Sequence, residues 1–466
     1  MSEKYDAVII GAGMSGLAAG IRLAMFDKKV VILEKHSISG GLNSYYNRKV
    51  KEMNDILKLD VGLHALTNFA KKSEKRKPLT KLLKQLRIPY DDLALREQSY
   101  SVINFKSADL KFSNDFDLLT SEIKNVFPSE LDSFVNFARY VSEYDELDLN
   151  SKYTSARDVL DAHFKDELLK EMLMAPLLIY GSAWENDMDF SQFVVMFKSL
   201  YFEGFSRPEG GVRSILDILL DKLSSLGAEV RFRHKVESIS HQGDQKIIDL
   251  GKKGTIKAPL VLSSIGIVET NNLFKKDALD FGAKVGKLSF LESIHFVRDK
   301  KPIKDFKATI VFHNDSDKYK YERPSELSDF SSAVFCLPNN YAQDNDGYGT
   351  IRVTYMANYD DWKSLDKKSY KEHKHEVANK AFDLSKKFLS GIETPFFSDT
   401  FSPTTIERYT GHLGGAVYGS PDKVKDGKIG IPGVYIIGTD QGFLGIVGSM
   451  LSGISMANLY GLMEQK

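Results

Sequence analysis

The stretch Val8-Ile9-Ile10-Gly11-Ala12-Gly13-Met14-Ser15-Gly16, followed after a short helical run by Val30-Val31-Ile32-Leu33-Glu34, decides the fold of this chain. An apolar strand leads into a glycine-rich turn, the turn opens a helix, and a second apolar strand ends in an acidic residue about 20 positions further on. This order is typical of a βαβ unit that binds a dinucleotide. The sequence therefore predicts an α/β fold built on a Rossmann-type sheet.

The spacing of the glycines follows from the charge of a pyrophosphate, which must reach backbone N–H groups at a helix N-terminus. Gly11 permits the tight turn, Gly13 lets the backbone approach the phosphates, and Gly16 lets the helix pack closely on the sheet. The carboxylate of Glu34 is placed to accept a hydrogen bond from a ribose hydroxyl. We therefore expect the phosphates to lie against the first turn of this helix.

Composition and charge exclude several classes of protein. The chain has 466 residues, enough for two intertwined domains, and its 63 basic and 63 acidic residues balance, so we expect no nucleic-acid partner. The single cysteine, Cys336, lies in an apolar run and is predicted to be a buried strand residue in a protein of a reducing compartment. No secretory leader precedes the first strand, so a cytoplasmic location is expected.

Two segments bear on membrane contact. Residues 441–463 carry no charge over a length sufficient to cross a bilayer, but their glycines and serines favour a tightly packed helix whose start faces a ligand. The loop before Pro78 is crowded by the basic residues Lys71, Lys72, Lys75, Arg76 and Lys77. We interpret this loop as solvated or, alternatively, as a lip that contacts anionic lipid transiently. The oligomeric state is left open.

The rest of the chain divides by its hydrophobic periodicity. Residues 79–200 are predicted to be mainly helical, and the apolar runs at 172–180 and 190–202 to be core or the wall of a tunnel for an apolar substrate. Glu209-Gly210-Gly211 opens a further helix that leads to strands of the α/β type. The segments 290–297, 308–312, 333–337 and 351–356 predict an antiparallel sheet, and 433–438 returns as a strand.

These segments predict two interleaved domains. Residues 1–70, 205–275 and 405–466 form a discontinuous FAD-binding domain, and residues 76–204 and 276–404 form an inserted α+β substrate domain of antiparallel sheet plus helices. FAD is favoured over a nicotinamide cofactor because its adenine, pyrophosphate and flavin ring are far apart. Such a cofactor needs contacts from several parts of a chain.

Several motifs together resemble one family. They are the segment from Gly11 to Glu34, Gly40-Gly41, Asp60-Val61-Gly62-Leu63-His64, Glu209-Gly210-Gly211, the passage Tyr409-Thr410-Gly411-His412-Leu413-Gly414-Gly415-Ala416-Val417-Tyr418-Gly419, and the block from Gly438 to Ser455. In this order they cover nearly the whole chain. The chain resembles the FAD-dependent family that includes phytoene desaturases, carotenoid cis-trans isomerases and retinol saturases.

This resemblance implies an FAD site formed by Gly11, Gly13, Met14, Ser15, Gly16, Glu34, Lys35, Gly40, Gly41, Leu42, Asn43, Val236, Gly438, Asp440, Gly445, Val447 and Gly448. It implies that Val236 contacts adenine through its backbone and that Gly438, Asp440 and Gly448 line the flavin. Many relatives carry arginine after the glycine doublet. This chain has Leu42-Asn43 there, which leaves no arginine at that position to contact the flavin or a phosphate.

The resemblance also implies an oxidoreductase or isomerase acting on a carotenoid-like or other long apolar polyene. A flavin accepts hydride from a C–H bond while a neighbouring carbon loses a proton, and saturation or redox-neutral isomerisation are the alternatives. His64 is the candidate acid or base, with a structural role as the alternative. A flavin amine oxidase and a non-enzymatic prenyl or lipid carrier are further hypotheses. His373 and His375 lack more ligands at a metal spacing, so no metal is predicted.

Overall fold

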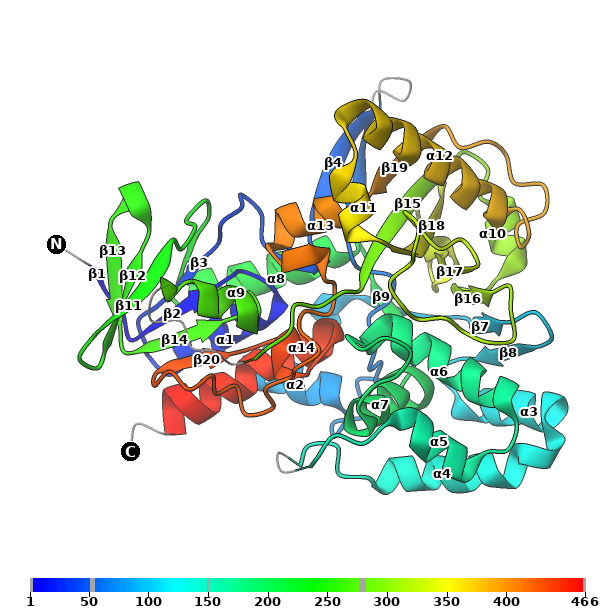
Figure 1. Cartoon of the computed structure of the whole chain (residues 1–466), viewed down its shortest axis with the longest axis horizontal. Helices are drawn as coiled ribbons and strands as arrows, with labels where there is room; N and C mark the ends of the chain where they lie inside the picture. The colour runs from blue at the N-terminus through cyan, green and yellow to red at the C-terminus, as the bar shows by residue number, and fades with distance from the viewer. Residues whose placement is uncertain (1–2, 51–54, 149–150, 276–281, 464–466) are drawn as a thin grey trace.

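The computed structural model describes residues 3–50, 55–148, 151–275 and 282–463. Figure 1 shows one part that contains both ends of the chain, and a second part in which a large sheet lies above a group of helices. The predicted domain limits at residues 1, 276 and 466 lie outside the described residues.

Five strands form the sheet that the opening stretch predicts. Their order is β10-β3-β2-β14-β20, and every neighbouring pair is parallel. All residues of three of them, β2, β3 and β14, are buried, as expected for parallel strands that are covered on both faces. The strands come from the start, the middle and the end of the chain: β2 Ala7–Ile10, β3 Val30–Leu33, β10 Glu229–Arg231, β14 Leu260–Ser263 and β20 Val434–Ile436.

Helices cover one face of this sheet, and small residues set their spacing. Helices α1 (Met14–Ala24), α8 (Val212–Ser225) and α14 (Gly445–Met456) share one apolar cluster with the strands. A Cβ on Gly453 would lie 2.1 Å from the carbonyl oxygen of Ser15, so α14 and α1 touch through their backbones. The opposite face packs on α9 (Ile267–Asn272) and on a sheet of order β1-β13-β12-β11, with bounds β1 Glu3–Lys4, β11 Ser238–Gln242, β12 Gln245–Asp249 and β13 Thr255–Ala258.

One helix of the described residues, Gly445–Met463, has the length and composition to cross a membrane. It consists of α14 and the π-helical continuation Ala457–Met463, and 61% of its most apolar window is buried. Its buried side packs on α1, where a Cβ on Gly461 would lie 2.4 Å from Leu23 Cδ2. This packing supports the interpretation of the segment as a core helix.

The second large sheet has seven strands in the order β19-β15-β18-β17-β16-β7-β8. The four strands predicted in this region are confirmed and pair antiparallel, but the sheet is mixed because β16 pairs with β7 in parallel. Cys336, at the end of β17, is buried as predicted. The bounds are β7 Ser101–Asn104, β8 Asp109–Phe112, β15 Ser289–Val297, β16 Ile310–Asn314, β17 Ser332–Cys336, β18 Gly349–Ala357 and β19 Phe397–Phe401.

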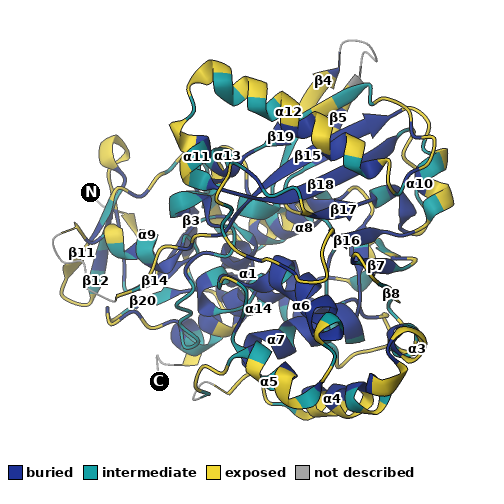
Figure 2. Cartoon of the chain, turned by 45° about the vertical axis from the view of Figure 1, so that its right-hand side comes forward, coloured by how far each residue is buried: buried dark blue, intermediate teal, exposed yellow. Residues whose placement is uncertain are grey.

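Helix α12 (Lys367–Ser385) lies across one face of this sheet. The side of the helix that points away from the sheet is exposed (Figure 2). The shorter helices α10 (Lys301–Phe306), α11 (Tyr359–Ser364) and α13 (Pro403–Thr410) lie near the ends of its strands. Two antiparallel pairs lie outside these sheets, β4 (Tyr45–Val50) with β5 (Asp55–Asp60) and β6 (Leu95–Glu97) with β9 (Ser206–Pro208).

Residues 79–200 are less uniformly helical than predicted, because β6, β7 and β8 lie within them. Strand β8 alternates exposed Asp109 and Lys111 with buried Leu110 and Phe112. This period of two spans a single short strand, which is too little to stand out beside helices of 8 to 15 residues. The helices are α2 Pro78–Leu86, α3 Phe116–Val126, α4 Leu131–Glu143, α5 Ala156–His163, α6 Glu167–Gly181 and α7 Phe190–Phe197.

His295 on β15 makes the stability of the fold depend on pH. Burial lowers its pKa from 6.5 to about 4, and its Nδ1 lies 2.8 Å from Ser398 Oγ while its Nε2 has no partner among the described residues. Between pH 6.5 and about 4 the unfolded chain binds a proton at this histidine and the folded protein does not, so the free energy of unfolding falls as the pH falls through this range.

We expect the free energy of unfolding to fall by roughly 1.4 kcal/mol more in the wild type than in His295→Gln when the pH drops from about 7.5 to about 5.5. Urea unfolding at the two pH values measures this difference. The control is His373→Gln, which replaces a histidine on helix α12 whose side chain is 38% exposed. An unchanged pH dependence in His295→Gln would contradict the assignment.

Candidate functional site

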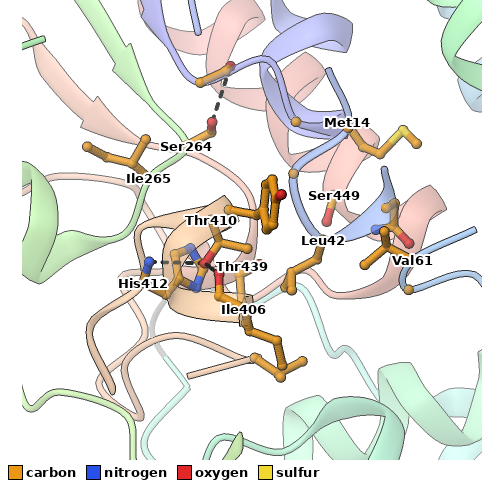
Figure 3. A pocket seen from close by; sticks show the side chains of 18 of the residues that line it. Met14, Leu42, Val61, Ser264, Ile265, Ile406, Thr410, His412, Thr439 and Ser449 are labelled. Atoms are coloured by element: carbon orange, nitrogen blue, oxygen red, sulfur yellow. Dashed lines mark hydrogen bonds between the residues drawn. The ribbon is translucent and has the colours of Figure 1, made fainter. Parts of the chain in front are cut away.

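A cavity of about 670 Å³ is lined by residues of both large sheets: the turn after β2, the end of β3, and strands β15, β17 and β18. This volume is in the range of about 300–1,000 Å³ that is usual for small-molecule sites. One group of lining residues is glycine backbone and polar side chains, and another is mainly apolar and aromatic. Side chains from widely separated segments meet around it (Figure 3).

The glycine-rich turn provides an anion site on the cavity wall. Gly11 has φ +96°, and a Cβ on Gly16 would lie 2.1 Å from the Gly11 carbonyl oxygen, so Gly16 brings the helix against the turn. Gly13 lines the cavity as the N-cap of α1, and a Cβ there would meet no described heavy atom within 4 Å. No described side chain caps the first turn of α1. Its N–H groups and helix dipole are therefore available to a pyrophosphate.

Glu34 keeps acceptor capacity for a ribose. Its two oxygens accept hydrogen bonds from the backbone N–H of Ala12 and of His36, each at 2.9 Å. A carboxylate has about four acceptor positions, so these bonds fix its orientation and leave others for a ligand. Glu34 lines the cavity, and so do the neighbouring Lys35, whose pKa is lowered by burial, and Val236. These placements fit the nucleotide end of FAD.

The second glycine pair approaches the first. The N–H of Gly40 donates to the carbonyl oxygen of Ala12 at 2.8 Å, and a Cβ on Gly41 would lie 3.8 Å from Gly13 Cα. Together with Met14 and Ser15 from α1, the whole segment from Gly40 through Asn43 lines the cavity. Two backbone segments thus face the same space with few side chains between them, which is the cradle that a diphosphate requires.

The C-terminal block is placed differently from what the resemblance implied. Gly445 lines the cavity, but Gly438, Asp440, Val447 and Gly448 do not, and neither does Gly16. Asp440 is 2% exposed, and its carboxylate accepts the N–H groups of Ile267 at 2.8 Å and Ser420 at 2.9 Å. The carboxylate therefore joins loops behind the wall, since these loop N–H groups need an acceptor in the interior.

Other residues of the C-terminal part line the cavity instead. They are Thr439, Leu444, Ile446 and Ser449 around the start of α14, and Thr410 and His412 from the Tyr409-to-Gly419 passage (Figure 3). The N–H of His412 donates to Thr410 Oγ1 at 3.1 Å, and its Nδ1 lies 2.9 Å from the carbonyl oxygen of Ala416. The same segments therefore reach the cavity, through residues that neighbour those predicted.

The second part of the molecule contributes apolar residues to the cavity wall. The runs at 172–180 and 190–202 are largely buried core, yet Ile179, Tyr180 and Met196 reach the cavity. These runs therefore form core and also contribute residues to the cavity wall. The remaining apolar lining residues include Phe290, Val334, Phe401, Ile406 and Val417.

His64 lies in this wall within a polar patch, which we define as His64, Tyr180, Glu292 and Thr354. Its Nε2 is 3.1 Å from Glu292 Oε2 and 3.2 Å from Thr354 Oγ1. Its Nδ1 is 3.5 Å from the hydroxyl of Tyr180. The histidine thus takes part in buried polar contacts and also faces the cavity.

A buried arginine supports the polar patch from behind. Arg352 is 2% exposed, pairs with Glu292, and donates to the carbonyl oxygens of Val61 at 2.7 Å and Leu63 at 2.6 Å. Burial alone would raise the pKa of Glu292, but the charge of Arg352 and the hydrogen bonds from His64 and Arg352 outweigh it and lower the pKa. Arg352 and Glu292 were not predicted from the sequence, although the acidic residue Glu292 inside the predicted strand 290–297 was a usable signal.

Comparisons with known proteins find one matching family, relatives of low sequence identity, and solved structures of the same fold. The family described as "Flavin containing amine oxidoreductase" matches residues 14–459. Prolycopene isomerase 2 of an Oncidium hybrid cultivar is 22% identical across 98% of this chain and 84% of its own length. All-trans-retinol 13,14-reductase of Danio rerio is 21% identical across 98% and 86% of the two chains. The structure of cyclohexylamine oxidase from Brevibacterium oxydans shares the fold, with a TM-score of 0.65 at 14% identity over 99% and 100% of the two chains.

Gly13→Asp tests the anion site. An aspartate at the N-cap repels a pyrophosphate, so we expect flavin retention to fall by at least about tenfold. The apo-protein should remain as stable or become more stable, because Asp is a favoured N-cap residue and the added side chain meets no described atom. The measurements are the ratio of flavin to protein absorbance and the thermal unfolding of the apo-protein. The control is Gly347→Asp, at an exposed position with open space. A Gly13→Asp protein that keeps its full flavin absorbance would refute the anion site.

Proposed function

We propose, from the premise that this chain belongs to the flavin containing amine oxidoreductase family, that it catalyses a redox or isomerisation reaction on a long apolar polyene. FAD is its cofactor. One observation carries the proposal: the glycine turn of a dinucleotide site and an extended apolar wall line the same cavity.

The charge of the wall favours an uncharged substrate. Among the lining residues from β15, β17, β18 and β19, Glu292 is the only charged one, and Arg352 neutralises it. An amine cation would find no free carboxylate among these strands. A hydrocarbon chain would be surrounded by aromatic and branched side chains, which release water on binding.

The names of two relatives support the same class. One is named for prolycopene and the other for all-trans-retinol, and both of these molecules are conjugated isoprenoids. The two names describe different reactions, an isomerisation and a reduction. The common element is the polyene, and that element is what we extend to this chain.

The lining residues indicate which segments would contact FAD and which would contact the substrate. Gly13, Glu34 and Val236 belong to the ranges proposed as the FAD-binding domain, residues 1–70, 205–275 and 405–466. Met196 and Val334 belong to the ranges proposed as the substrate domain, residues 76–204 and 276–404. The placement supports the seven-stranded sheet with its helices as the substrate-handling part.

FAD, when bound, supplies two-electron chemistry. The protein residues have simpler tasks. The backbone of the glycine segments binds the phosphates, Glu34 orients the ribose, and the apolar wall holds the polyene and excludes water.

The direct test uses the purified holoprotein without oxygen. It is mixed with carotenes and retinol, once with oxidised and once with reduced flavin, and products and flavin absorbance are followed together. We expect conversion of at least one polyene in one of the two flavin states. No conversion in either state, with hydrogen peroxide released from an amine panel in air, would instead establish an amine oxidase.

Val334→Phe tests the apolar wall. Val334 on β17 is 2% exposed and lines the cavity, so a larger side chain narrows the space. A narrower cavity leaves less room for a long chain than for a short one, so we expect KM for a long polyene to rise about tenfold, with a smaller change for a shorter one. Steady-state kinetics with two chain lengths measures the effect. Val285→Phe, at a position that is 43% exposed, should change neither value; equal effects on both chain lengths would contradict the role of Val334.

A further inference from the structure

The protonation of the polar patch can be derived from its contacts. Arg352 is a donor only, and its charge keeps the buried Glu292 ionised, so Glu292 is an acceptor only. The contact of 3.1 Å between Glu292 Oε2 and His64 Nε2 therefore requires a hydrogen on Nε2. A neutral imidazole with hydrogen on Nε2 has its lone pair on Nδ1.

This lone pair is on the side of the ring that meets Tyr180. The Tyr180 hydroxyl lies 3.5 Å from Nδ1, Tyr180 and His64 both line the cavity, and the His64 side chain is 12% exposed. A carboxylate on one nitrogen that leaves the other nitrogen basic is the arrangement by which proteins prepare a histidine for proton transfer.

We propose that His64 exchanges the proton of the reaction through Nδ1, and that Glu292 and Arg352 are positioning residues that hold its tautomer. The inference rests on the proposed function. In a desaturation, one C–H bond of the substrate would give up a hydride, for which FAD, when bound, would be the oxidant. The neighbouring C–H bond gives its proton to Nδ1 of His64, and its electron pair becomes the new double bond. Saturation is the reverse, with the proton returned from His64 to carbon.

The other groups around His64 do not replace it in this role. Thr354 and Tyr180 are neutral, and burial raises the pKa of Tyr180 well above its usual value. Cys336 and Tyr341 contact only the His64 carbonyl oxygen, at 3.3 and 3.4 Å, and burial raises the pKa of the Cys336 thiol to about 11.

A second ion pair lies near the loop that carries His64 and joins Arg207 to Asp60. Arg207 also donates to the Leu63 carbonyl oxygen at 2.8 Å. The charges of Arg207 and Arg352 are thus matched by those of Asp60 and Glu292. The expected effect of pH on the rate is opposite for desaturation and for saturation. Desaturation needs neutral His64 and saturation needs the imidazolium, so a rise in pH favours the first and disfavours the second.

Glu292→Gln separates this role from packing. Arg352 offers only donors, so the glutamine must turn its oxygen to Arg352 and its amide NH₂ to His64 Nε2. Nε2 then becomes an acceptor, the hydrogen moves to Nδ1, and the base facing Tyr180 is lost with little change in volume. The matched control is Glu171→Gln, which alters another buried glutamate paired with an arginine, Arg157, on a different cavity.

The experiment has a readout that needs no substrate. Imidazole ¹⁵N spectra of the holoenzyme, with the His64 signals assigned by their loss in His64→Gln, report which nitrogen carries the hydrogen above the ionisation. We expect hydrogen on Nε2 in the wild type and in Glu171→Gln, and on Nδ1 in Glu292→Gln. Hydrogen on Nδ1 in the wild type, or no change in Glu292→Gln, overturns the inference.

The second readout is the pH profile of single-turnover polyene conversion. We expect His64→Gln and Glu292→Gln to lose the ionisation and at least about 100-fold in rate, while Glu171→Gln keeps both. An unaltered profile in His64→Gln overturns the catalytic role. If the wild type converts no polyene, the proposed function fails, and the tautomer measurement still decides the inference by the outcomes above.

Discussion

The burial of Arg352 is the constraint on which the two halves of this molecule depend. A guanidinium that is 2% exposed must find acceptors within the protein, because leaving a buried charge without its partner costs about 3–5 kcal/mol. Arg352 lies on β18 of the seven-stranded sheet, and two of its acceptors are carbonyl oxygens of the segment that follows β5. The hydrogen bonds therefore hold an N-terminal loop against a sheet almost 300 residues later in the chain and keep His64 at the wall of the cavity.

The cavity lies where backbone without side chains faces large apolar side chains. On the cofactor side, Gly13 and Gly41 withhold side chains, so backbone donors are exposed to a ligand. On the substrate side, Phe290 and Val334 present bulk from strands whose other residues fill a core. The first arrangement suits a charged diphosphate and the second a hydrocarbon. A ligand pair of this kind needs both, and neither sheet alone supplies them.

What the sequence predicted well depends on local pattern. The strand, turn and helix from Val8 to Gly16 were identified because the decisive spacings lie within a few residues, and the strand at 290–297 because its apolar run is long. Strand β8 was missed because its alternation covers only Asp109 to Phe112.

The pair of Glu292 and Arg352 was missed for a different reason. Its partners are 60 residues apart along the chain, and its contact with His64 spans 228 residues. Asp440 shows what a sequence motif does not predict, which is the direction of a side chain. The N–H groups of Ile267 and Ser420 hold the Asp440 carboxylate away from the cavity. Long-range hydrogen bonds of this kind have no signature in local periodicity.

A single proton site beside an apolar wall constrains the chemistry more than the direction of the reaction. Desaturation and saturation are reverses of each other, so the groups that serve one serve the other, and His64 receives the proton in one direction and delivers it in the other. A redox-neutral isomerisation can use the same site by delivering a proton to a polyene and taking one back. The cavity therefore selects the substrate and places the proton. The net direction follows from whether electrons are supplied to the flavin or removed from it, which is a property of the redox partner rather than of the wall that holds the polyene.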